Sequence, residues 1–249
     1  MEFLLQPLTL VTFFPLLGVL VLLFLSSENK NLLRWTAMVF SLATFGISLW
    51  VLSMFNSGNP HLQLVAKYDW ITVAGWNIQY HLGVDGLSIL LVLLTAFLTP
   101  ISILSTWTAV EDRVKDFMIF FLLLEVGMMG VFLAQDLFLF YIFWDVSLVP
   151  MYFIIDQWGG PNRKYAATKF MIYSVGGTLG MLLATQLIGW SAGTFDIQTL
   201  IQTWPAFREG SARGTCEALA ELPDDSGVCR GATAPALYGP APARGRAWR

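Results

Sequence analysis

Six apolar stretches, each close to the roughly 20 residues that cross a bilayer core, follow one another in the first 207 residues. They cover about residues 3–25, 32–55, 84–106, 117–134, 137–155 and 167–190. The chain is 56% hydrophobic and only 12% charged, a balance typical of helical membrane proteins. The sequence therefore predicts an all-α polytopic protein of the lipid bilayer, with about six transmembrane helices in residues 1–207.

Lysine and arginine are divided unevenly between the two sides of these stretches. Seven lie in or beside the connections after the first, third and fifth: Lys30, Arg34, Arg113, Lys115, Arg163, Lys164 and Lys169. Up to residue 207, the opposite side holds only Lys67. Because these residues concentrate on the cytoplasmic side of membrane proteins, the N-terminus is predicted to lie outside.

The longest connection, residues 56–83, is expected outside. Residues 65–82 are rich in β-branched and aromatic side chains around Ala74 and Gly75, which favours a small β hairpin. His61 and His81 lie in this connection. Since no partner ligands are spaced nearby, we interpret them as solvated loop histidines rather than metal ligands.

Residues 208–249 differ in character from the rest of the chain. They contain six arginines and no lysine, many Ala, Gly and Pro residues, and no hydrophobic periodicity. This composition predicts a disordered tail. We hypothesise that the tail is out of frame or follows a disrupted gene, and the alternative is a genuine basic, proline-rich extension.

Several classes of function are disfavoured by the composition. Both cysteines, Cys216 and Cys229, fall in the tail, and no Cys/His cluster or glycine-rich phosphate loop is present. We therefore expect no metal, NAD, flavin or iron–sulfur cluster to bind to this chain. The net charge of −3 gives no basic surface for nucleic acid.

Two carboxylates, Glu125 and Asp145, stand in the middle of apolar stretches. Each is ten residues from Gln135, at the turn between the fourth and fifth stretches, which places both about 15 Å from that turn. Ionisable groups at this depth are costly and are usually functional, so we predict a proton pathway. If the two face each other, they should share a proton. The alternative for each is a protonated carboxyl that is hydrogen-bonded into helix packing.

Other residues could support these carboxylates. Tyr141 and Tyr152 share a helical face with Asp145 and could hold water. Lys169 is most simply a snorkelling anchor, although it could pair with Asp156 or with a deeper carboxylate. Two glycine pairs, Gly127 with Gly130 and Gly176 with Gly180, predict close helix packing.

Four stretches resemble subunit M, or chain 4, of proton-pumping NADH–quinone oxidoreductase (complex I): residues 130–153 (GVFLAQDLFLFYIFWDVSLVPMYF), 81–88 (HLGVDGLS), 98–104 (LTPISIL) and 165–170 (YAATKF). The resemblance covers about residues 1–205. It implies an antiporter-like membrane subunit that moves protons while other subunits reduce quinone. Those other membrane subunits would be partners, and NAD, FMN, iron–sulfur clusters and quinone would be bound elsewhere in the complex.

The resemblance also assigns roles and a location. Asp145 occupies the position of the family's essential mid-membrane glutamate, with a side chain one methylene shorter, and Glu125 stands in the preceding helix. The implied location is a bacterial-type inner (plasma) membrane. The family's fold has fourteen helices in two inverted repeats, and this chain ends within the first. We therefore expect a truncated part of a translocase that does not pump alone. The alternatives are a subunit of a multisubunit cation/proton antiporter or a non-functional truncated product.

Overall fold

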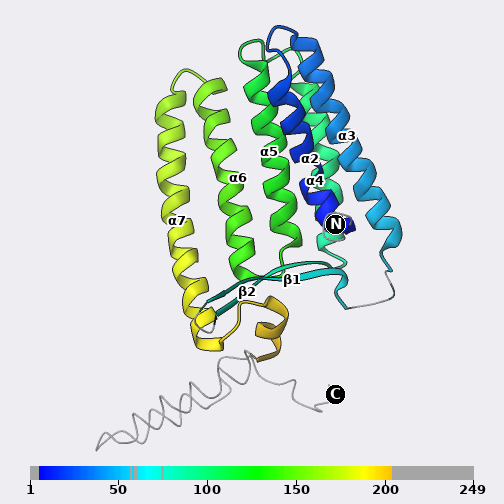
Figure 1. The fold of residues 1–249 in the computed structure, drawn as a ribbon. Helices are drawn as coiled ribbons and strands as arrows, with labels where there is room; N and C mark the ends of the chain where they lie inside the picture. The colour runs from blue at the N-terminus through cyan, green and yellow to red at the C-terminus, as the bar shows by residue number, and fades with distance from the viewer. Residues whose placement is uncertain (1–5, 57, 59–60, 74–75, 204–249) are drawn as a thin grey trace, which may run out of the picture. The chain divides into compact units, whose positions relative to one another are not determined.

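The structure, a computed structural model, describes residues 6–56, 58, 61–73 and 76–203. In this part of the chain, six helices are long and apolar enough to cross a membrane: α2 (Pro7–Phe24), α3 (Lys30–Met54), α4 (Ser88–Ser105), α5 (Val114–Leu133), α6 (Leu137–Trp158) and α7 (Arg163–Ala192). Successive helices run in opposite directions (Figure 1). The predicted all-α membrane architecture is confirmed.

Several helix ends differ by a few residues from the predicted stretches. The third helix begins at Ser88 rather than at residue 84, because Val84 still belongs to a strand. Helix α6 continues to Trp158, and α7 begins at Arg163, before the predicted residue 167. Hydropathy marks the lipid-crossing part of a helix, whereas polar end turns extend beyond it.

The chain divides into two compact units, Met1–Leu200 and Ile201–Arg249. Of the second, only residues 201–203 are described, so the prediction about the tail at 208–249 falls outside the described residues. Residues 3–5, the start of the first predicted stretch, also fall outside them. Everything that follows concerns the first unit.

The predicted β hairpin is present between α3 and α4. Strands β1 (Gln63–Val73) and β2 (Trp76–Val84) pair antiparallel, with Tyr68 opposite Tyr80 and Lys67 opposite His81. The hairpin lies across the end of the bundle where α2 and α6 begin (Figure 1). We call this the hairpin end.

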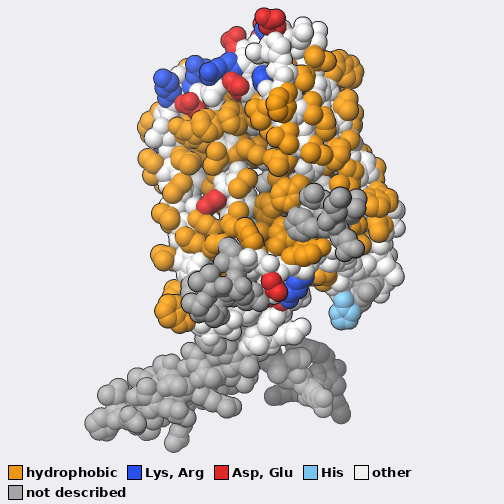
Figure 2. Space-filling model, in the orientation of Figure 1, with side chains coloured by type: hydrophobic (Ala, Val, Ile, Leu, Met, Phe, Trp, Pro, Cys, Tyr) orange, Lys and Arg blue, Asp and Glu red, His pale blue; other side chains and the backbone are white. Residues whose placement is uncertain are grey.

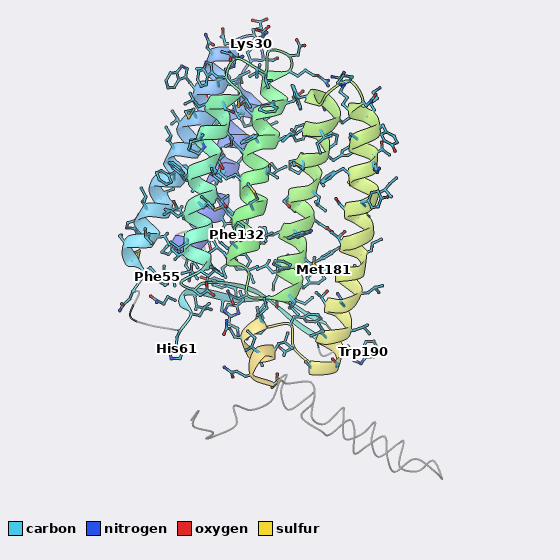
Figure 3. All side chains as sticks on the ribbon, turned by 180° about the vertical axis from the view of Figure 1, so that it is seen from behind. Lys30, Phe55, His61, Phe132, Met181 and Trp190 are labelled. Atoms are coloured by element: carbon cyan, nitrogen blue, oxygen red, sulfur yellow. The ribbon has the colours of Figure 1, made fainter. Side chains whose placement is uncertain are left out.

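The opposite end of the bundle gathers the positive charge. The helix starts and the connections there carry Lys30, Arg113, Lys115, Arg163 and Lys164, and blue side chains cluster at that end in Figure 2. Figure 3 labels Lys30 and His61 at opposite ends of the molecule. We call the positively charged end the basic end. Apolar side chains cover the visible face between the two ends (Figure 2), as expected for helices that contact lipid.

The buried core lies mainly among α2, α3, α4 and α5. One cluster at the basic end includes Leu22, Leu33 and Leu122, and another at the hairpin end includes Leu8, Met129 and the strand residue Leu82. By contrast, α6 and α7 bury little of their surface. These two helices therefore form the open side of the bundle.

A side-chain cap fixes the start of α6, the helix that carries Asp145. The Asp136 carboxylate accepts hydrogen bonds from the backbone N–H groups of Phe138 at 2.9 Å and Leu139 at 3.2 Å, which caps the start of α6. Farther along, Pro150 sits inside α6 without ending it. The cap and the tight turn at Gln135 and Asp136 hold α5 and α6 as adjacent antiparallel helices.

Candidate functional site

Glu125 is completely buried in the middle of α5. Its exposed fraction is 0%, and neither carboxylate oxygen has a hydrogen-bond partner among the described residues. It lies eight residues from the end of α5 at Leu133, or about 12 Å at 1.5 Å per residue. A carboxyl that is hydrogen-bonded into helix packing, the alternative considered from the sequence, is not what this part of the chain shows.

The contact between α5 and α6 shows which way Glu125 faces. A Cβ atom at Gly127 would lie 2.8 Å from Ser147 Cβ, so Gly127 faces α6 directly. Glu125 precedes Gly127 by two residues, or about 200° around the helix, and therefore points away from α6. Leu122, one turn from Glu125 on the same face, packs against Gly18 of α2. Glu125 thus faces the core formed with α2, α3 and α4.

That core also buries hydroxyl groups from three helices. Each donates to a backbone carbonyl of its own helix, at 2.7–3.0 Å: Thr12 of α2, Ser41, Thr44 and Ser48 of α3, and Thr95 and Thr99 of α4. This arrangement satisfies their protons within the hydrocarbon layer. Their oxygens can still accept hydrogen bonds, so the core around α5 is less purely apolar than its aliphatic side chains suggest.

Asp145 lies at a similar depth on α6 but on the other side of the α5–α6 contact. It is eight residues from the start of α6, again about 12 Å. Ser147 and Phe143 are the α6 residues that meet the glycines of α5, and Asp145 is two residues from each, hence also about 200° away. The two carboxylates therefore point in opposite directions, Glu125 away from α6 and Asp145 away from α5. The structure does not form the shared-proton pair considered from the sequence.

Asp145 is half-buried and has one of its expected neighbours. Tyr141, one turn earlier on the same helical face, interacts electrostatically with the Asp145 carboxylate. Tyr152 lies two turns farther along the same face, and its ring packs edge-on against Phe153 at 5.3 Å. The structure thus joins Tyr141 to Asp145 and shows no such contact for Tyr152 in the part of the chain that it describes.

Lys169 is exposed near the start of α7. Its ammonium group lies 5.9 Å from the ring centre of Tyr165 and 6.0 Å from that of Tyr173. No ion pair joins it to Asp156 or to another described carboxylate. An ammonium held over exposed tyrosine rings close to the basic end fits the anchoring role that the sequence favoured.

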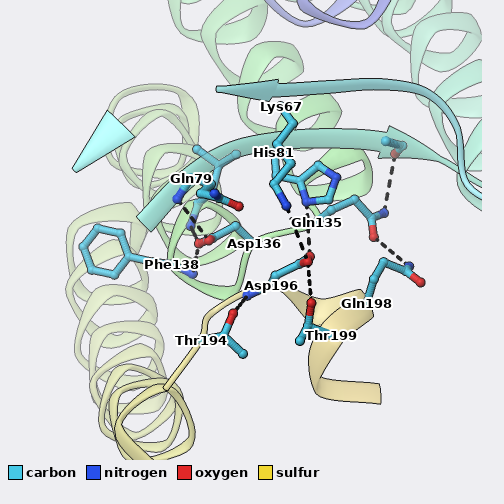
Figure 4. A network of polar contacts seen from close by, with 12 residues as sticks. Lys67, Gln79, His81, Gln135, Asp136, Phe138, Thr194, Asp196, Gln198 and Thr199 are labelled. Carbon is cyan, nitrogen blue, oxygen red and sulfur yellow. Dashed lines mark hydrogen bonds and ion pairs between the residues drawn. The ribbon is translucent and has the colours of Figure 1, made fainter. Parts of the chain in front are cut away.

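A second group of polar residues, at the hairpin end, joins segments that are far apart in sequence (Figure 4). We define the hairpin-end cluster as Lys67 of β1, His81 of β2, Asp136 of the α5–α6 turn and Asp196 after α7. The Nδ1 atom of His81 lies 3.2 Å from Asp196 Oδ1, and Lys67 Nζ lies 3.8 Å from Asp196 Oδ2.

Backbone contacts reinforce this cluster. The N–H of Gln135 donates to the His81 carbonyl at 2.8 Å, and that of Ile197 donates to the Gln135 carbonyl at 2.9 Å. Asp136 accepts from the N–H of Gln79 at 3.3 Å in addition to capping α6. Its carboxyl is 1% exposed, and burial raises its pKa above the ordinary 3.8.

The interpretation of His81 as a solvated loop histidine is wrong. Its side chain is buried, with 5% of the residue exposed, and burial lowers its pKa below the ordinary 6.5. His61, in the same connection, is exposed as expected. Local patterns could not reveal the burial of His81, because the groups that cover it come from more than 50 residues farther along the chain. The sequence offered one signal for this cluster, which is Asp136, an acidic residue directly before a helix and therefore a candidate helix cap.

Comparison with known proteins places this geometry in a family. Residues 134–219, which include α6 and Asp145, match the family described as NADH:quinone oxidoreductase/Mrp antiporter, TM. NADH-quinone oxidoreductase subunit M of Rhodobacter capsulatus is 45% identical over 199 residues, which is 78% of this chain. The predicted family is confirmed.

Solved structures of antiporter-like subunits share the fold. Respiratory complex I from Thermus thermophilus contains a chain that aligns with a TM-score of 0.65 and 25% identity, covering 78% of this chain and 39% of that one. The Mrp complex from a Dietzia species aligns with the same TM-score at 18% identity, covering 83% of this chain and 22% of that one. The chain spans only 38% of the Rhodobacter relative's length, so it corresponds to less than half of an antiporter-like subunit.

Proposed function

We propose that the chain is part of a proton-translocating membrane subunit of an NADH–quinone oxidoreductase. The observation that carries the proposal is Asp145, a carboxylate at mid-membrane depth on a lipid-length helix, inside the segment that matches the antiporter family. Quinone reduction and its redox groups would belong to partner subunits, and this chain would supply proton-binding positions.

Asp145 is the residue best placed to exchange protons. It is half-buried on the open side of the bundle, where water or another helix can reach it, and Tyr141 lies one turn away on the same face of α6. A donation from the Tyr141 hydroxyl to this carboxylate would fix its orientation and favour a defined proton-transfer geometry. Lys169, on the neighbouring helix α7, would help to anchor this side at the basic end.

Glu125 would act as a separate proton-binding position. Because it faces the α2–α4 core while Asp145 faces away from α5, a proton cannot pass between them by a direct hydrogen bond. A complete lack of exposure and the absence of a described partner are unusual for a carboxyl whose only task is packing. We therefore propose a role for Glu125 in proton movement that is distinct from that of Asp145.

Orientation and location follow from the charge distribution. The basic end would face the cytoplasm of a bacterial-type inner membrane, with the N-terminus and the hairpin end outside. Other membrane subunits of the complex would cover the sparsely buried surfaces of α6 and α7. On its own, a chain of this length would not pump.

The test uses a complete subunit that carries this segment, assembled in its complex in membrane vesicles. We expect Asp145→Asn to lower NADH-driven proton pumping at least tenfold, because the amide cannot take up a proton. Asp156→Asn, the same change near the basic end of α6, is the matched control and should leave pumping unchanged. Undiminished pumping by Asp145→Asn, with the complex fully assembled, would refute the proton-binding role of Asp145.

A second function, a subunit of a multisubunit cation/proton antiporter, is favoured by one specific observation. The fold likeness to the Mrp complex equals that to complex I. The neighbouring genes distinguish the two functions. Genes for cysteine-rich redox subunits support the oxidoreductase, whereas membrane subunits alone support the antiporter. Failure of the chain to assemble with partner subunits in a membrane extract would support the remaining alternative, a non-functional product.

A further inference from the structure

The hairpin-end cluster connects three segments that are far apart in the sequence. The β hairpin, the α5–α6 turn and the segment after α7 meet there, and isolated β bridges join Leu82 to Ala134 and Asp136 to Asp196. The backbone bonds of Gln135 and Ile197 link the three in series. Figure 4 shows His81 and Asp196 side by side in this network. Any change in their contact therefore affects all three segments.

The charges around His81 come from each of these segments. Asp196 faces it from the segment after α7, Lys67 from β1 and Asp136 from the α5–α6 turn. Because an ionised carboxylate can only accept, the Nδ1–H of His81 donates to Asp196. Lys67 and Thr199 occupy the other oxygen of the same carboxylate, at 3.8 Å and 2.8 Å. Asp196 thus already has a cation beside it.

We propose that His81 and Asp196 form a proton-sensitive latch, which holds the β hairpin to the α5–α6 turn and the segment after α7 while His81 is neutral, and loosens when His81 binds a proton. A second positive charge would then enter a buried ring next to the ammonium group of Lys67. The inference rests on the proposed function only for its orientation, in which the latch faces the side that receives protons.

The direction of the pH effect follows from burial. Burial lowers the pKa of His81 below 6.5 and outweighs the attraction of the Asp196 carboxylate, which favours the protonated ring, so the folded latch prefers the neutral ring. The stability that this preference contributes is fully present above the ordinary pKa of 6.5, and it is lost as the pH falls through the lower pKa of the folded state. Acidification on that side of the membrane therefore weakens the latch.

Hydrogen–deuterium exchange of the full chain in lipid nanodiscs tests this inference. The reporters are the amides of Gln135 and Ile197, compared at about pH 7.5 and about pH 5.5 after correction for intrinsic exchange rates. We expect protection to fall with acidification, by at most about tenfold per pH unit, the limit for one titrating group. His81→Gln should abolish the dependence, whereas His61→Gln, in the same connection, should retain it.

Two results would overturn the latch. One is equal protection of these amides at both pH values in the unaltered chain, and the other is a pH response that persists in His81→Gln. If His81→Gln does not fold, Lys67→Gln decides, because removing the competing cation should shrink the response. Exchange is measured without transport, so the outcome is independent of the Asp145→Asn experiment.

Discussion

Replacing Glu125 by methionine should stabilise the bundle. Methionine is close to glutamate in length and adapts its shape, whereas the carboxyl is 0% exposed and has no described hydrogen-bond partner. Leaving a buried polar group unsatisfied costs about 1–3 kcal/mol, which the substitution recovers. For a folded unit of this size, that corresponds to a rise in melting temperature of about 2–12 °C.

Thermal unfolding in detergent micelles, followed by circular dichroism, measures this shift. Leu122→Met is the matched control, because Leu122 lies one turn away on the same face of α5 and a volume-conserving swap there should cost less than about 1.5 kcal/mol. A melting temperature that falls further for Glu125→Met than for Leu122→Met would refute the argument, since it would mean that the carboxyl has a stabilising partner. In the complete subunit, a gain in stability together with a loss of pumping would mark Glu125 as functional.

Two further predictions concern stability, and both are checked by the same unfolding measurement. Gly127→Ala should cost about 1–3 kcal/mol, because its Cβ would press on the backbone of Ser147, whereas Gly176→Ala, with open space around it, should be neutral or stabilising by up to about 1 kcal/mol; equal effects would contradict the packing described for α5 and α6. Asp136→Ala should cost about 1–2 kcal/mol through loss of the α6 cap. Asp136→Asn should keep the cap. Burial raises the pKa of Asp136, so the folded state favours the protonated carboxyl. The contribution of this preference to folding stability is present below pH 3.8 and is lost as the pH rises through the raised value. The stability of Asp136→Asn should therefore not fall over that pH range. A pH profile of stability identical to that of the unaltered chain would contradict this prediction.

The parts of the fold that depend on local composition were predictable. Length and hydropathy were enough to locate the six described helices, and alternating β-branched residues indicated the hairpin. The depths of Glu125 and Asp145 followed from their equal spacing around the turn at Gln135. Their mutual orientation did not, because helix rotation depends on which face packs closely, and only Gly127 and Gly130 hinted at that face.

Long-range contacts were the least predictable. The burial of His81 depends on Asp196, 115 residues later, and on the α5–α6 turn. No pattern within the hairpin reports what will cover it. The two glycine pairs illustrate the same limit, since Gly127 and Gly130 meet α6, whereas Gly176 and Gly180 have nothing within 4 Å. The first pair is three residues apart and the second four, so each places two small residues on one helix face, and the neighbouring helix decides whether that face is packed.

Under the proposed function, the depth of Asp145 would have an electrical consequence. A group midway through the hydrocarbon layer lies about halfway through the membrane's electric field, and a full crossing is worth about 2.3 kcal/mol per elementary charge per 100 mV. A proton that reaches Asp145 from either side therefore crosses half of the voltage, or about 1.15 kcal/mol per 100 mV. This changes its occupancy roughly sevenfold, since about 1.36 kcal/mol corresponds to tenfold. An energised membrane would thus bias from which side this aspartate is filled, even without any movement of the helices.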